Sequence, residues 1–252
     1  MKYIRVDSDG AIARVTLARP EKKNALNRDT AAELLQAFTS CAQHVDTKVV
    51  LLAADGPDFC AGADLAALAE LLDASPDAQY EDAELLGRVF MAIREMPKPV
   101  VAAVTGRALA GGAGLASACD VVYAAEGAEF GYPEVRVGFV PAMVMTMLRR
   151  SVGEKRAFEL VSTGRRVSAK EALEMGLVSR VLPDAGFQDA VNALVGEMAA
   201  TSASAQQLTK RLFYQLDDLD FQNGIAAGIR TNIAARRTPD FRAGVERFTR
   251  KG

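Results

Sequence analysis

The amino-acid sequence predicts an α/β fold in which a mainly parallel β-sheet is covered by helices. Short runs of β-branched and other apolar residues at 48–53, 100–104 and 121–125 have the length and composition of buried strands. Segments with helical spacing separate these runs, and this order is typical of parallel strands. From about residue 188 the pattern contains no further strand. We therefore expect a sheet-based core followed by a helical layer.

The chain is predicted to open with a β-hairpin, 3–6 and 11–17. The two arms alternate around Asp9-Gly10, a dipeptide that accepts positive φ angles. Asn27 follows as a good N-cap for a helix, because its side chain can accept a hydrogen bond from the first helical turn. The order up to residue 53 is therefore hairpin, helix, strand.

The middle of the chain alternates loops and helices. A loop at 55–62 precedes a helical stretch near Asp64, and a longer helix at 77–96 stops at Pro97. The segment 106–114 is predicted to be a glycine-rich turn that opens a helix of small residues.

The remainder is predicted to be irregular at 130–141 and then mostly helical. Ser168 begins a capping box, and Gly176 is a helix stop. Further helices are expected at 153–163 and from about residues 187, 201, 218 and 239.

The composition excludes several classes of protein. Thirty basic and 32 acidic residues in 252 leave a net charge of −2, so no broad basic surface is available and nucleic acid is an unlikely partner. Three cysteines without CxxC spacing and the single His44 cannot form a multi-histidine metal site or a structural zinc site. No metal is expected. His44 is interpreted as a surface residue.

The charge and hydropathy pattern predicts a cytoplasmic protein with no membrane association. Within a few residues of the N-terminus, polar and apolar residues alternate, so the segment lacks the continuous apolar core of a secretory signal. The longest apolar stretch, 108–119, consists mostly of Ala and Gly and stops at Asp120, so it is too short and too weakly apolar to cross a bilayer.

Two loops of small residues, 59–64 and 106–114, are the first candidates for a site. Each is predicted to follow a strand and precede a helix, where backbone N–H groups are exposed with little side-chain cover. If the loops lie side by side, one N–H from each could hold the same oxygen, as in an oxyanion hole. Taken alone, each loop is more simply explained as a tight turn with close helix packing. A nucleotide-binding loop fits less well, because Ser117 stands where the dinucleotide fingerprint requires Gly or Ala.

Five segments occur in a fixed order along the chain. They are Arg19-Pro20 with Asn24-Ala25-Leu26, FCAGADL at 59–65, PKPVVAAVTGRALAGGAGLASACDVVYA at 97–124, FGYPEVRVGFVP at 130–141 and SAKEALEMGLVS at 168–179. With these segments the sequence resembles the crotonase (enoyl-CoA hydratase/isomerase) superfamily over nearly the whole chain.

The resemblance implies a ClpP/crotonase fold of repeated β-β-α superhelical turns. It implies a core with the acyl-CoA site over residues 1–187 and a helical oligomerisation region over 188–252, which assembles trimers or dimers of trimers. It also implies an acyl-CoA thioester substrate and no separate cofactor, because coenzyme A is part of the substrate.

The resemblance also implies catalytic roles. The thioester oxygen would be held by the N–H groups of Ala63 and Gly111, with Gly112 as a nearby fallback. Glu134 matches one of the two acid/base glutamates of the family, whereas Gly114 matches the other, so one carboxylate is missing. A free glutamate has a pKa near 4.3, so Glu134 is expected to be an ionised base at neutral pH.

The missing carboxylate leaves two reactions open. Hydration of a 2-enoyl thioester requires a positioned water and a proton donor, for which two-glutamate relatives use both carboxylates. Isomerisation of a 3-enoyl thioester requires one base that moves a proton from C2 to C4, which suits a single glutamate. Some hydratases of branched or dicarboxylic thioesters resemble this sequence in having glycine at the first position, so overall resemblance favours hydration.

Other positions match places where relatives hold coenzyme A. Phe248 and Lys251 match positions that reach the nucleotide of a neighbouring subunit. The residues predicted to contact the substrate within one subunit are Lys22, Ala25, Ala61, Asp64, Leu65, Gly112 and Gly114.

The sequence has two alternative interpretations from other classes of function. A nicotinamide-dependent oxidoreductase is disfavoured, because the glycine-rich loop lies a hundred residues into the chain and no acidic residue ends a following strand. A non-catalytic relative that binds acyl-CoA or RNA is the third hypothesis. Cys60, beside the proposed hole, is interpreted as a small buried filler.

Overall fold

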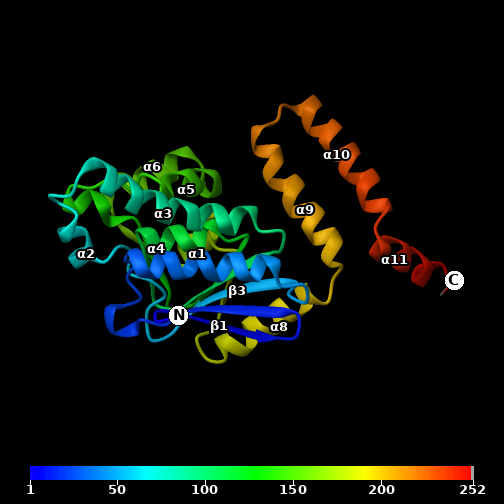
Figure 1. Ribbon diagram of the computed structural model, residues 1–252, viewed down its shortest axis with the longest axis horizontal. Coiled ribbons are helices and arrows are strands. Elements are labelled where there is room, and N and C mark those ends of the chain that lie inside the picture. The colour runs from blue at the N-terminus through cyan, green and yellow to red at the C-terminus, as the bar shows by residue number, and fades with distance from the viewer. Residues whose placement is uncertain (251–252) are drawn as a thin grey trace.

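The computed structural model describes residues 1–250 and has a six-stranded sheet at its centre (Figure 1). The strand order is β1-β2-β3-β4-β6-β9. The hairpin pair β1 and β2 is antiparallel, as predicted, and the other neighbours are parallel. The strands are β1 (Ile4–Asp9), β2 (Ile12–Leu17), β3 (Val49–Ala54), β4 (Val100–Val104), β6 (Val121–Ala125) and β9 (Arg180–Leu182).

A second sheet contains three short strands, β5 (Arg107–Leu109), β7 (Glu129–Gly131) and β8 (Arg166–Ser168). β5 directly follows β4, and β7 directly follows β6, so each long strand continues into a short one before the next helical segment. This repetition is the β-β-α unit that the resemblance implies, and the fold class is confirmed.

Eleven α-helices occur in the described part of the chain, and several begin at the predicted caps. The side chain of Asn27 accepts a hydrogen bond from Thr30 N, and that of Ser168 accepts one from Glu171 N. The helices are α1 (Arg28–Gln43), α2 (Leu65–Glu70), α3 (Pro76–Glu95), α4 (Gly111–Ala118), α5 (Val144–Val152), α6 (Glu154–Thr163), α7 (Ala169–Met175), α8 (Phe187–Ala199), α9 (Ala203–Gln215), α10 (Phe221–Arg236) and α11 (Pro239–Thr249). Short 3₁₀ helices are η1 (Pro20–Lys22), η2 (Pro133–Val137) and η3 (Leu216–Asp218).

The central sheet buries a core on each face, because alternate residues of a strand point to opposite sides. In β3, Val50 and Leu52 face the larger core, which also contains residues of α1, α3 and α4. Val49 and Leu51 face a smaller core covered by α8. This arrangement explains why β3 is apolar on both faces.

The helical arm of the structure begins later in the chain than the predicted boundary after residue 187. Phe187, Val191 and Val195 of α8 are buried against the central sheet, so α8 belongs to the core. The helices α9 and α10 lie side by side and form, with α11, an arm that extends away from the sheet (Figure 1). The arm therefore begins at α9.

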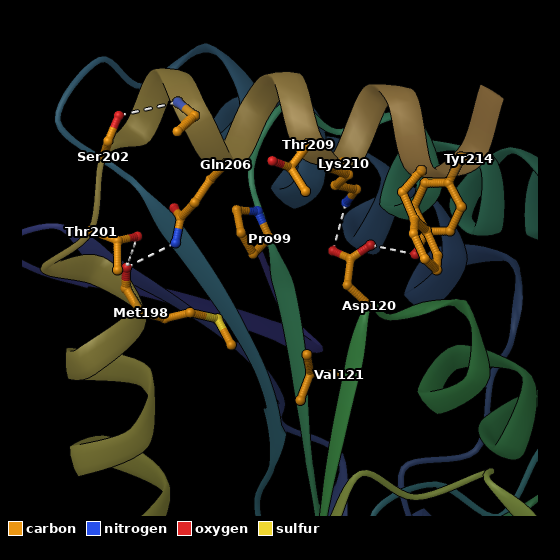
Figure 2. Close-up of a pocket in the computed structure, with 12 residues that line it drawn as sticks. Pro99, Asp120, Val121, Met198, Thr201, Ser202, Gln206, Thr209, Lys210 and Tyr214 are labelled. Atoms are coloured by element: carbon orange, nitrogen blue, oxygen red, sulfur yellow. Dashed lines mark hydrogen bonds and ion pairs between the residues drawn. The ribbon is translucent and has the colours of Figure 1, made fainter. Parts of the chain in front are cut away.

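A buried polar cluster attaches α9 to the core. Lys210 is 8% exposed, and its Nζ donates to Asp120 Oδ2 at 2.7 Å and to the carbonyl oxygens of Ile93 and Lys98. Tyr214 donates its hydroxyl to the other Asp120 oxygen, as Figure 2 shows. Burial lowers the pKa of Lys210, but three acceptors satisfy its ammonium group.

Some elements differ from the sequence prediction. The segment 130–141, expected to be irregular, contains the end of β7 and the helix η2, and α5 was not expected. The strands β5, β7, β8 and β9 have three residues each, which is too short for an alternating pattern to be recognised. No helix within residues 1–250 has both the length and the hydropathy needed to cross a membrane.

Candidate active site

The two loops of small residues lie side by side. Cys60 and Ala108 form a parallel β-bridge, in which Leu109 N donates to Cys60 O at 2.9 Å. Gly62 packs closely against Ala110, the N-cap of α4. The space between them is so small that a Cβ atom at Gly62 would lie 2.7 Å from Ala110 Cβ. Backbone pairing therefore brings together two segments that are about fifty residues apart.

Glycine is required where the loops cross most closely. A Cβ atom at Gly112 would lie 2.3 Å from Cys60 O, and one at Gly106 would lie 1.9 Å from Pro57 O. Gly106 also has a φ of +57°, which few other residues adopt readily. The simple explanation of these glycines as packing and turn positions is thus correct, and the same packing places the candidate donors.

The N–H groups of Ala63 and Gly111 are the two candidate donors. Gly111 is the first residue of α4, so its N–H has no acceptor within the helix. Ala63 forms a parallel β-bridge with Leu26, but the hydrogen bonds of this bridge involve the carbonyl of Gly62 and the N–H of Asp64, and not the N–H of Ala63. Within residues 1–250, neither donor has a protein acceptor. Both N–H groups are available to a ligand.

Ala110 holds the backbone before Gly111 in an unusual conformation. Its φ of +50° and ψ of −123° lie outside the usual regions for a residue with a Cβ atom. Its N–H donates to Gly131 O at 2.8 Å, which ties the turn to β7. Strained backbone of this kind is found where the surrounding structure fixes the direction of a functional group.

Glu134 reaches the same region through the second sheet. Leu109 of β5 pairs with Gly131 of β7, and Glu134 follows three residues later on η2. Its Oε2 atom is buried and has no hydrogen-bond partner. Burial raises the pKa of Glu134 above the ordinary glutamate value, because it disfavours the charged form. A buried carboxyl oxygen without a protein partner is a candidate for proton transfer to and from a ligand.

Gly114 faces apolar side chains. It is buried on α4, and a Cβ atom there would lie 2.4 Å from Val144 Cγ1 and 3.1 Å from Phe90 Cζ. A larger residue at this position would require those side chains to move. The space beside Gly114 is thus filled by α5 and α3, and the site has Glu134 without a second carboxylate at this position.

Most of the other predicted contact residues lie around the edge of the first loop. Ala61 donates its N–H to Lys23 O at 3.0 Å, and Ala25, two residues after Lys23, is buried. Asp64 caps α2 and pairs with Arg19 at 2.8 Å, which holds the pKa of Asp64 below its usual range. Leu65 is 69% exposed, and Lys22 is exposed on η1.

The predicted C-terminal contacts lie apart from this region. Phe248 is 78% exposed on α11, and Figure 1 places α11 and α2 at opposite ends of the molecule. Phe248 therefore does not join the loop residues within one chain. Lys251 lies outside the described residues.

Asn24 has a role that the sequence did not indicate beyond its place in a motif. It is 1% exposed, and its amide donates to Asp55 O at 2.9 Å and to Asp58 O at 2.8 Å. Its Oδ1 accepts a hydrogen bond from Arg19 N. The side chain thus fixes the segment after η1 against the first loop. A further pair, Asp58 and Arg107, joins the two loops.

Cys60 and His44 have the surroundings that the sequence predicts for them. Cys60 is fully buried and its Sγ donates to Asn24 O, while burial raises the pKa of the thiol to about 12. A thiol with this pKa stays protonated at neutral pH. His44 is exposed at the end of α1. The interpretations as buried filler and surface histidine are confirmed.

A cavity of about 430 Å³ beside α9 contains none of the predicted site residues. Among its polar groups, Lys210 and Tyr214 both donate to the carboxylate of Asp120 (Figure 2). Within residues 1–250, no group of three or more His, Cys, Asp or Glu side chains could hold a metal ion.

Comparisons with known proteins identify the family to which the chain belongs. The sequence profile of the enoyl-CoA hydratase/isomerase family matches residues 7–252. A Thermus thermophilus relative, whose name assigns it provisionally to the enoyl-CoA hydratases, is 40% identical over 96% of both chains. An enoyl-CoA hydratase structure from Mycobacterium smegmatis has a TM-score of 0.93 and 33% identity, covering 99% of this chain and 96% of the other.

A second solved structure extends the similarity to human proteins. Human enoyl-coenzyme A hydratase domain-containing protein 3 has a TM-score of 0.94 and 30% identity, covering 99% of this chain and 98% of the human one. The profile match, the sequence identity and the shared fold all extend over nearly the full chain. The protein therefore belongs to the enoyl-CoA hydratase/isomerase family and has the crotonase fold.

Proposed function

We propose that this protein hydrates a 2-enoyl-CoA thioester, using Glu134 to transfer protons and the N–H groups of Ala63 and Gly111 to hold the thioester oxygen. Membership of the family makes the protein an enzyme of the enoyl-CoA hydratase/isomerase type. The specific proposal rests on a pair of free backbone donors on adjoining loops, and on a buried oxygen of Glu134 that has no partner and follows the strand paired with the second loop. Such donors stabilise negative charge that develops on a carbonyl oxygen.

The reaction needs one base and one oxyanion hole. Glu134 takes a proton from water as the water oxygen forms a bond to C3 of the substrate. The electron pair of the double bond moves towards the thioester, giving an enolate whose oxygen accepts hydrogen bonds from Ala63 and Gly111. Glu134 then returns the proton to C2, so the product contains one additional water.

Isomerisation of a 3-enoyl thioester is the alternative, and the surroundings of Gly114 favour it. Val144 and Phe90 fill the space in which a second carboxylate would stand. With Glu134 as the sole proton carrier, the enzyme would remove a proton at C2 and return it at C4. The same two backbone donors would hold the oxygen of the intermediate.

Mass analysis after incubation with a panel of 2-enoyl and 3-enoyl thioesters tests this proposal. Hydration of a 2-enoyl substrate adds the mass of one water, whereas isomerisation of a 3-enoyl substrate leaves the mass unchanged and moves the double bond. If thioesters bind but no product forms, the result would instead support the hypothesis that the protein is a non-catalytic member of the family that binds acyl-CoA.

We expect Gly114→Glu alone to destabilise the protein, and a paired change to be tolerated better. Because the new Cβ would meet Val144, overpacking should cost about 1–3 kcal/mol of unfolding free energy. Adding Val144→Ala makes room and should recover much of that loss, with more hydration relative to isomerisation. Urea titration and product ratios measure both effects. A stable paired variant with an unchanged ratio would show that position 114 does not face the reacting carbons.

The arm supports a homo-oligomer, which we propose to be a trimer or a dimer of trimers. Four apolar residues spaced by four on α10 are exposed: Phe221 (84%), Ile225 (53%), Ile229 (57%) and Ile233 (49%). They lie along a groove of about 810 Å³ between α9 and α10. A second copy of this chain is the occupant that the proposed assembly supplies, and Phe248 would then reach the nucleotide end of a neighbour's substrate.

Ile229→Lys is expected to shift the oligomer to monomers, because it places a charge in the centre of the apolar stripe. Sedimentation velocity measures the change. Ala234→Lys is the matched control, since Ala234 is exposed on α10 but does not line the groove. If Ile229→Lys and the control sediment alike, the groove is not the interface.

A cytoplasmic location accords with the state of the cysteines. Cys41, Cys60 and Cys119 are buried free thiols. Reducing compartments keep cysteines in this form.

A further inference from the structure

An ion pair between a buried aspartate and a partly exposed arginine joins the two loops that carry the candidate oxyanion donors. Arg107 approaches Asp58 with two parallel contacts of 2.6 Å, Nε to Oδ1 and Nη2 to Oδ2. The backbone N–H of Arg107 also donates to Asp58 Oδ1 at 3.2 Å. Two-pronged contacts of this kind fix the relative position of both partners more strictly than a single hydrogen bond does.

The pair lies at the base of both loops. Beyond Asp58, the chain forms two hydrogen bonds with the second loop, Phe59 N to Thr105 O and Cys60 N to Arg107 O, both of 2.9 Å. The first loop continues to Ala63 and the second to Gly111. A shift of one loop along the other would therefore alter the distance between the two donors.

The surroundings of the pair make it stronger than an ordinary surface contact. The Asp58 side chain is 6% exposed and that of Arg107 is 35% exposed. The guanidinium of Arg107 holds the pKa of Asp58 below its usual range. Arg107 also pairs in register with Glu129, two residues before Gly131, so the same residue connects the hole to the strand that leads to Glu134.

We propose that Asp58 and Arg107 are positioning residues that set the spacing of the Ala63 and Gly111 donors. Neither side chain contacts the proposed reacting atoms. Their effect is exerted through the backbone of the two loops, and this inference rests on the proposed function. A displacement of about 1 Å in a catalytic group can cost roughly a hundredfold in rate, so loosening the pair should act mainly on kcat.

Kinetics of Arg107→Met and of the double variant Asp58→Asn/Arg107→Met test the inference. Arg107→Met leaves the carboxylate of Asp58 buried and unpaired, so part of its effect will be on stability. The double variant removes the buried charge and should recover stability. For both variants we expect kcat to fall about 10- to 100-fold while KM for the thioester changes less than about threefold. Arg107→Lys, which keeps the charge but loses the two-pronged contact, should recover only part of kcat.

The exposed pair Arg5 and Asp55 provides the matched control. Arg5 Nη1 lies 2.8 Å from Asp55 Oδ2 near the start of the first loop, but the pair does not connect the loops, so Arg5→Met should leave kcat unchanged. If the double variant recovers both stability and kcat, the pair is only structural and the inference is wrong.

A second measurement does not depend on turnover. Amide hydrogen exchange in Arg107→Met should be faster at Cys60 and Leu109, whose N–H groups join the loops, while that of β3 and β4 stays at the wild-type rate. Unchanged exchange at these amides would overturn the inference. If the wild-type protein converts no thioester, but Arg107→Met still shows faster exchange at Cys60 and Leu109, only the proposed function is contradicted.

Discussion

Glu134→Gln is expected to lower kcat by about a thousandfold, since a positioned general base contributes roughly 10²–10⁴ in rate. The amide keeps the shape of the side chain but cannot accept a proton, so thioester affinity should stay nearly intact. Steady-state kinetics with a binding titration separates the two quantities. Glu126→Gln, on an exposed turn before β7, is the matched control. If Glu134→Gln retains most of kcat, Glu134 is not the base.

The raised pKa of Glu134 gives the same residue a pH signature. Because the base must be ionised, kcat/KM should fall as the pH is lowered through a pKa above the ordinary glutamate value. The folded state also binds this proton more tightly than the unfolded state, so Glu134 reduces stability as the pH rises through the same window. Glu134→Gln should therefore unfold at a higher urea concentration than wild type at pH 7, with the difference lost at low pH.

Gly111→Pro is expected to lower kcat by about 10²–10³-fold, because it removes one of the two donors to the thioester oxygen. Proline is tolerated at the first position of a helix, where the N–H has no intrahelical acceptor, so α4 itself should persist. Circular dichroism checks the fold, and steady-state kinetics measures the loss.

Gly111→Ala separates the donor from the side chain. A Cβ atom at this position would lie 3.4 Å from Leu26 Cδ1, which is ordinary contact, and the alanine keeps its N–H group. We expect its kcat to stay within about tenfold of wild type, well above that of the proline variant. Equal losses in the two variants would mean that the space beside Gly111, and not its N–H, matters for turnover.

The longer elements of the fold could be predicted from local sequence because local signals determine them. The hairpin around Gly10 and the helix capped by Asn27 both occur where their turn and cap residues indicate. The three-residue strands could not be predicted, since their hydrogen bonds come from distant partners such as Leu109 and Gly131. Their pairing also carries Glu134 to the site, so part of the site depends on the elements that are hardest to predict.

The boundary of the tail differs for a related reason. A helical pattern shows that a segment is amphipathic but does not show which surface covers its apolar face. The face of α8 that includes Val191 and Val195 covers the sheet, whereas Ile225 and Ile229 on α10 are exposed. The two patterns are similar in sequence and differ only in what they pack against.

The candidate site, too, could be predicted only in part from the sequence. The sequence indicated that 59–64 and 106–114 have exposed N–H groups, and the resemblance paired Ala63 with Gly111. The contacts that join the loops, including the ion pair of Asp58 and Arg107, connect residues that are far apart in the chain. The side chains around Gly114 come from α3 and α5, so the cause of its small size is visible only in the folded protein.

In the proposed reaction, Glu134 delivers a solvent proton to C2 of an enolate held by Ala63 and Gly111. Incubation of a 2-enoyl-CoA thioester in D₂O, with NMR and mass analysis of the product, measures this proton transfer. We predict a 3-hydroxy product with one carbon-bound deuterium at C2, formed by wild type and slowed about a thousandfold in Glu134→Gln. An unchanged 2-enoyl thioester, or equal rates of deuterium incorporation in the two proteins, would contradict this role of Glu134.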